Sequence, residues 1–163
     1  MPPEAFDTVL SMHPTAHTTR YQRAQALDRL GRHDDAIREL EAVAKVVPGE
    51  APTAMLAIVH AHAGRIGHAR ELLAHVSALF LRAQVFAALG DRERMFDMLE
   101  NALRTDVGGL QNLISSPAFD PYERDPHFLD FAARAGFPLP LRPRRLHGDS
   151  AEARGLGATS QLR

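Results

Sequence analysis

Histidine is the residue type in this chain with the greatest capacity for chemistry, because nine are present and neutral imidazole is a common metal ligand. His60 and His62 lie two positions apart, so on a helix they point to nearly opposite sides and cannot share an ion. His68 and His75 can face alike, but no carboxylate or cysteine completes a set of three or four ligands. The spacing favours structural or solvated histidines over a metal site, and we expect no cofactor.

Motifs for catalysis are also missing. No serine lies in a Gly-x-Ser-x-Gly sequence, and the chain has no cysteine, which excludes disulfides and thiol catalysis. Gly155-Leu-Gly157 lacks the third glycine and the preceding strand of a dinucleotide loop. The acidic residues Asp34, Asp35, Asp120 and Asp125 fall at expected helix starts, where capping explains them better than calcium binding does. We therefore expect that the chain is not an enzyme.

The charge balance gives no reason to expect nucleic acid or membrane partners. The chain has 19 basic and 20 acidic residues, so no overall field attracts polyanions. Arg142, Arg144 and Arg145 have no aromatic residues between them, which favours a solvated tail over a nucleic-acid contact. No apolar run approaches the roughly 20 residues that span a bilayer, and no signal peptide is recognisable, so we expect a cytoplasmic location.

Proline and glycine recur at the interval of a helical repeat. Pro14 and Pro48 lie 34 residues apart, Gly64 follows Gly31 by 33 residues, and Gly90 follows Gly64 by only 26. A polar turn and a new amphipathic run follow each glycine, as in a helix-turn-helix unit that must stack on its neighbours to bury its apolar face. The short second unit predicts a local change in superhelical rise.

Hydrophobic periodicity predicts helices between these breaks, with glycine at the left-handed position after a helix and Ser77 as one N-cap. The predicted helices cover residues 18–30, 34–46, 52–63, 67–76, 77–89 and 91–105.

Small and large apolar residues follow a recurring order in these helices. The first helices contain Ala24, Ala57 and Ala83, and the second helices contain Ala36…Leu40…Val43, Ala69…Leu73…Val76 and Met95…Leu99…Ala102. This order resembles the tetratricopeptide repeat, in which small residues lie where two helices cross. Val43, Val76 and Met95 depart from the family pattern. The resemblance implies an all-α solenoid of about three helix pairs with a concave partner-binding face.

Residues 117–138 resemble the closing segment of many bacterial tetratricopeptide proteins. The likeness rests on Phe-Asp-Pro at 119–121, Asp-Pro-x-Phe at 125–128 and Gly-x-Pro at 136–138. Such arrays often follow a winged-helix DNA-binding, nucleotide-cyclase or protein kinase domain. From the residues themselves, Asp125 can cap a helix that begins at Pro126. The apolar face expected to cover the last repeat contains Phe128, Phe131 and Ala132, and Phe119 should be buried beside it.

The chain is therefore expected to have four parts: a partial repeat over 1–16, helical repeats over 17–106, a capping segment over 107–138 and a disordered tail over 139–163. Phe6, Val9 and Pro14 match Leu40, Val43 and Pro48 at a spacing of 34 residues, so the chain opens on the second helix of a unit. We expect an upstream repeat or domain, or self-association through this edge. Adequate capping by residues 3–12 is the alternative.

The expected function is to scaffold protein–protein interaction by binding a partner segment in the concave groove. One alternative is a regulatory or sensory region of a larger bacterial signalling or transcription-regulating protein. Another is metal or small-ligand binding by the histidines. In the family the first helices line the groove, which predicts the partner-binding residues Tyr21, Gln25, Asp28, Arg29, Ala54, Ile58, His62, Phe80 and Gln84. Ile58 and Phe80 can instead pack between repeats.

Overall fold

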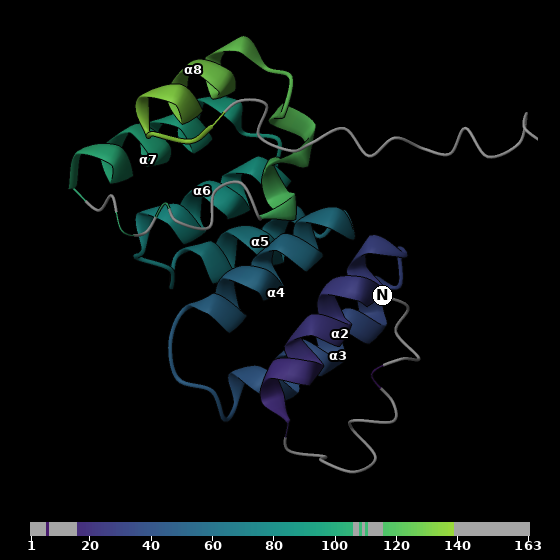
Figure 1. The fold of residues 1–163 in the computed structure, drawn as a ribbon. Helices are drawn as coiled ribbons and strands as arrows, with labels where there is room; N and C mark the ends of the chain where they lie inside the picture. The colour runs from purple at the N-terminus through teal and green to yellow at the C-terminus, as the bar shows by residue number, and fades with distance from the viewer. Residues whose placement is uncertain (1–5, 7–15, 106–107, 109, 111–115, 139–163) are drawn as a thin grey trace, which may run out of the picture.

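A computed structural model of the chain describes residues 6, 16–105, 108, 110 and 116–138 (Figure 1). All regular structure in these ranges is helical, which confirms the predicted all-α class. The elements are α2 (His17–Arg29), α3 (His33–Ala44), α4 (Ala51–His62), α5 (Ile66–Leu73), α6 (Leu79–Ala88), α7 (Arg92–Thr105), the 3-10 helix η3 (Pro117–Tyr122) and α8 (Pro126–Arg134). Within the same ranges, no helix is both long and apolar enough to cross a membrane.

Consecutive helices pack in pairs: α2 with α3, α4 with α5, and α6 with α7. The pairs follow one another in chain order, with α2 and α3 at one end and α8 at the other (Figure 1). Helix α4 also packs on α3 and α6, which joins the three pairs. The first helices contribute Ala24, Ala57 and Ala83, each fully buried. Because alanine has no side chain beyond Cβ, helices can approach closely at these positions.

Glycine ends the first helix of each pair in the same way. Gly31, Gly64 and Gly90 have φ of 74°, 74° and 70°, the left-handed region in which a Cβ is strained. At the first of them the Gly31 amide donates to the Asp28 carbonyl and the Arg32 amide to the Leu27 carbonyl, both at 2.9 Å. This is the Schellman arrangement, which satisfies the last carbonyls of a helix. The predicted left-handed conformation of Gly31 is confirmed, and Gly64 and Gly90 adopt the same conformation.

The second pair differs from its neighbours in length. Helix α5 has 8 residues, whereas α3 has 12 and α7 has 14. A short second unit was predicted from the sequence. The prediction placed the end of its second helix at Val76, whereas α5 ends three residues earlier, at Leu73.

The prediction that Ser77 caps the following helix is wrong. Helix α6 begins at Leu79 with Ala78 in the N-cap position. Instead, the Ser77 hydroxyl donates to Glu50 Oε1 at 2.6 Å, while the Ser77 and Ala78 amides both donate to Glu50 Oε2 at 2.8 Å. These bonds hold the pKa of Glu50 below its usual range, and the hydrogen bond from the Ala78 amide has the largest effect. A carboxylate from the preceding helix pair thus takes the place of a local cap.

The closing segment packs as predicted. Phe119, Phe128 and Phe131 are all buried, and the Phe119 ring lies 5.5 Å from the Phe128 ring. Asp125 caps α8: its Oδ1 accepts from the His127 amide at 2.8 Å and the Phe128 amide at 3.4 Å. The predicted start at Pro126 is confirmed.

Asp125 also ties the closing segment to α7. The Arg92 guanidinium donates to it from Nε at 2.8 Å and from Nη2 at 3.0 Å. That paired bond, with the two backbone amides, lowers the pKa of Asp125 to about 2.

Two predictions concern the ends of the chain. Phe6 is buried, whereas Val9 and Pro14, which complete the predicted partial repeat, lie outside the described residues. The predicted disordered tail at 139–163, with its arginines, lies outside them as well.

Candidate binding pocket

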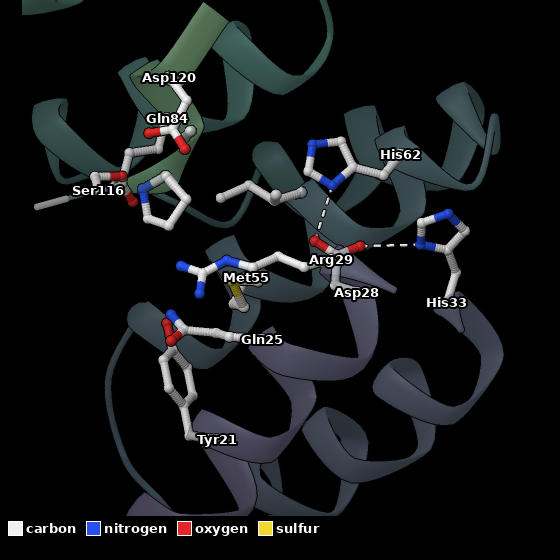
Figure 2. Close-up of a pocket in the computed structure, with 13 residues that line it drawn as sticks. Tyr21, Gln25, Asp28, Arg29, His33, Met55, His62, Gln84, Ser116 and Asp120 are labelled. Carbon is white, nitrogen blue, oxygen red and sulfur yellow. Dashed lines mark hydrogen bonds and ion pairs between the residues drawn. The ribbon is translucent and has the colours of Figure 1, made fainter. Parts of the chain in front are cut away.

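A pocket of about 500 Å³ opens between the first helices of the three pairs and the start of the closing segment (Figure 2). It lies within the range of small-molecule and peptide-anchor sites. The lining residues are Tyr21, Gln25, Asp28, Arg29, His33, Met55, Ile58, His62, Gln84, Ser116, Pro117, Ala118 and Asp120.

Seven of the nine predicted groove residues line this pocket: Tyr21, Gln25, Asp28, Arg29, Ile58, His62 and Gln84. Ala54 and Phe80 do not line it, and both lie in the core, at 1% and 7% exposure. The Phe80 ring packs 5.8 Å from the ring of Phe119, so the closing segment covers the part of α6 that the prediction left open. Whether the seven bind a partner remains a prediction.

The sequence did not indicate that the remaining wall residues belong to the groove. Ser116, Pro117, Ala118 and Asp120 reach the pocket because the closing segment folds back onto α6. Ser116 is itself buried, and its hydroxyl accepts a 2.9 Å hydrogen bond from the Gln84 amide. This bond fixes the far wall, and no local sequence pattern indicates a contact across 32 residues.

A buried carboxylate lies at the other end of the pocket. The Asp28 side chain is only 6% exposed, and both of its oxygens are used. Its Oδ1 bonds to Nδ1 of His33, and its Oδ2 bonds to Nδ1 of His62, each at 2.9 Å (Figure 2). Since a buried carboxylate is costly without partners, the two imidazoles stabilise it and join α2, α3 and α4.

The contact with Asp28 changes the pKa of His62. Its hydrogen bond to Asp28 raises the pKa of the imidazole, against an opposing effect of burial. His33, the first residue of α3, was missed because its contact with Asp28 crosses the Gly31 turn. Asp28 therefore links α2 to α3 and α4, and each of its oxygens already has one protein partner.

Arg29 is the cation that a ligand would meet. Its side chain extends across the pocket between Gln25 and the closing segment (Figure 2), and it forms no ion pair with any described carboxylate. Tyr21 stands beside Gln25, and burial raises the pKa of its phenol, so the hydroxyl remains a neutral donor. Arg29 and Tyr21 therefore provide hydrogen-bond donors in the pocket, and Met55 provides apolar surface beside them.

The histidines that the structure describes are not grouped as metal ligands. Among the residues that the structure describes, no group of three or more metal-ligating side chains could hold a metal. His60 and His62 do point to different sides, because His60 stacks on His68 with ring centres 5.4 Å apart while His62 bonds to Asp28. Burial is the main cause of a lowered pKa for His60.

Comparisons of the chain with protein-family models, with curated proteins and with solved structures give no match. What the pocket binds is therefore inferred from its own residues.

Proposed function

We propose that this chain is a tetratricopeptide-like solenoid module that binds a segment of a partner protein in the pocket between its first helices. The observation that carries the proposal is the convergence of side chains from α2, α4 and α6 on one pocket, together with Arg29, which forms no ion pair with a described carboxylate. Arginine and tyrosine are the residue types that most often anchor protein interfaces.

The repeat architecture is supported by features that recur between pairs. The three first helices end on a left-handed glycine, and each contains a fully buried alanine. Stacked pairs of this kind leave one helix of each pair on a shared face, so a ligand can touch several repeats at once.

The chemistry of the pocket favours a short polypeptide segment. Arg29 and Gln25 can donate to carbonyl or carboxylate oxygens, while Met55 and Ile58 offer apolar surface for a side chain. The wall at Ser116 closes the pocket on the α6 side. We therefore expect an anchor of a few residues rather than a long helix lying along the whole array.

A display experiment tests this proposal. A library of random peptides is selected against the wild-type chain and, in parallel, against the Tyr21→Ala/Arg29→Ala double variant. We expect a common motif to be enriched on the wild type and lost on the double variant. An Arg124→Ala variant is the matched control, because Arg124 is exposed and lies outside the pocket. Equal enrichment on all three proteins would contradict the proposal.

A further inference from the structure

A second pocket, of about 490 Å³, opens between α5, α6 and α7 and shares no lining residue with the first. Its walls contain three arginines. The lining residues are Arg70, Leu73, Ala74, Arg82, Phe86, Leu89, Asp91, Arg94 and Met98.

The short helix α5 accounts for this space. Helix α3 packs broadly on α4, the first helix of the next pair, whereas α5 meets α6 over only a few residues. Because α5 ends at Leu73, this helix does not cover the surface of α6 and α7 beyond that residue. The pocket is thus a consequence of the shortened second unit.

Two of the arginines are held in place by the same buried ring. The guanidinium carbons of Arg82 and Arg94 lie 5.7 Å and 5.9 Å from the centre of the Phe86 ring, which is within cation–π range. Arg82 Nη1 also donates to the Val76 carbonyl at 2.8 Å, just beyond the end of α5. These contacts preorganise two cations at the pocket wall.

The pocket has an excess of positive charge. Three arginines face one carboxylate, Asp91, which pairs with Arg94 Nη1 at 3.3 Å. Arg70 is exposed and pairs with no carboxylate among the described residues. Among the lining residues, three positive charges therefore face one negative charge, and the carboxylate of Glu50 also interacts with Arg82. The other walls are apolar, from Leu73, Leu89 and Met98.

We propose that this second pocket binds a phosphomonoester, with its dianionic phosphate on the arginines and its organic part against the apolar walls. The guanidinium fork matches the geometry of phosphate oxygens, and a dianion matches the charge excess better than a single carboxylate does. The volume suits a ligand of metabolite size. This site is independent of the first pocket and adds a small-molecule ligand to the proposed peptide partner.

Isothermal titration calorimetry with phenyl phosphate and phenyl sulfate tests the charge requirement. The second pKa of a phosphate ester is about 6, so phenyl phosphate is mainly a dianion at pH 7.5 and a monoanion at pH 5, whereas phenyl sulfate is a monoanion at both. We expect phenyl phosphate to bind more tightly than phenyl sulfate at pH 7.5, and this preference to disappear at pH 5. Equal affinity of the two at pH 7.5, or no binding of either, would overturn the proposal.

Variants locate the site. Arg70→Gln and Arg94→Gln should each weaken phenyl phosphate binding on the order of tenfold, because each removes a charge-assisted hydrogen bond. Arg124→Gln makes the same charge change outside the pocket and should leave the affinity unchanged. Circular dichroism of each variant checks that the helices remain folded. If Arg94→Gln and Arg70→Gln bind like Arg124→Gln, the phosphate lies elsewhere and the assignment is wrong.

Discussion

Asp28 and His62 lie 34 residues apart in the chain, yet Oδ2 of the one and Nδ1 of the other are separated by only 2.9 Å. Their contact joins α2 of the first helix pair to α4 of the second. Asp28 is almost fully buried, whereas the His62 side chain keeps 39% of its surface exposed at the rim of the binding pocket. The hydrogen bond between Asp28 and His62 therefore joins two helix pairs and also lies at the edge of the binding pocket.

Removing the imidazole of this hydrogen bond should destabilise the fold. His62→Ala leaves one oxygen of the buried Asp28 without its protein partner, which we expect to lower the free energy of unfolding by about 1 kcal/mol, because partial exposure lets water replace some of the bond. Urea denaturation at pH 6 measures the change. His75→Ala is the control: His75 is exposed, so its loss should change stability by at most about 0.5 kcal/mol. Equal losses from the two variants would show that the contact with Asp28 contributes nothing.

The same contact should make stability depend on pH. The pKa of His62 in the folded chain is raised above 6.5, so the folded state binds the proton more tightly than the unfolded state does. The resulting stabilisation is fully present below pH 6.5 and is lost as the pH rises through the raised value. His60 has a lowered pKa and acts in the opposite direction, so the wild type must be compared with His62→Gln, which retains His60.

We therefore expect the stability advantage of the wild type over His62→Gln to be larger at pH 5.5 than at pH 8.5. Urea denaturation of both proteins at the two pH values provides the comparison. An advantage that is constant or grows toward pH 8.5 would contradict the raised pKa.

The closing segment should contribute strongly to stability. Phe128 is buried, and its ring packs against the rings of Phe119 and Tyr122 on η3, so Phe128→Ala should cost about 3–5 kcal/mol through lost burial and an unfilled cavity. Val46→Ala is a control for apolar truncation, since Val46 is 56% exposed and should lose no more than about 0.5 kcal/mol. Thermal and urea unfolding of the two variants decide whether residues 126–134 belong to the same cooperative unit as the three helix pairs.

The cap on α8 gives a prediction for one carboxyl group. Carbon-detected NMR titration should place the pKa of Asp125 at about 2 in the wild type. Arg92→Gln removes the main cause of that low value and should move the pKa upward toward 3.8. Arg104→Gln, a charge change at the end of α7 away from Asp125, should leave it in place. An unchanged pKa in Arg92→Gln would assign the shift to the backbone amides alone.

Where the fold was predictable, the cause is local. Gly31 and Gly64 end helices because a left-handed residue after a helix favours glycine, whatever the rest of the chain does. Asp125 followed by Pro126 specifies a helix start for the same kind of reason. These positions need only their immediate neighbours, so the sequence alone was sufficient.

Predictions failed where distant residues decide the outcome. Ser77 resembles an N-cap, but Glu50 lies close enough to bind its hydroxyl and two nearby amides. Phe80 fits the pattern of a groove residue, but Phe119 covers it. Periodicity also placed Asp28 on the groove without showing that His33 and His62 occupy both of its oxygens. The face of a helix can be predicted from its own residues, whereas what covers that face cannot.

The most direct test of partner binding in the first pocket is the affinity of a library-selected peptide for the chain with and without Arg29. Arg29 has no partner among the described carboxylates, so Arg29→Ala should remove a binding contact without leaving a broken internal ion pair. Calorimetric titration should show that this change weakens binding on the order of tenfold or more, as truncation of an interface anchor does, while Arg124→Ala binds like the wild type. A peptide that binds Arg29→Ala and the wild type with equal affinity would contradict recognition in this pocket.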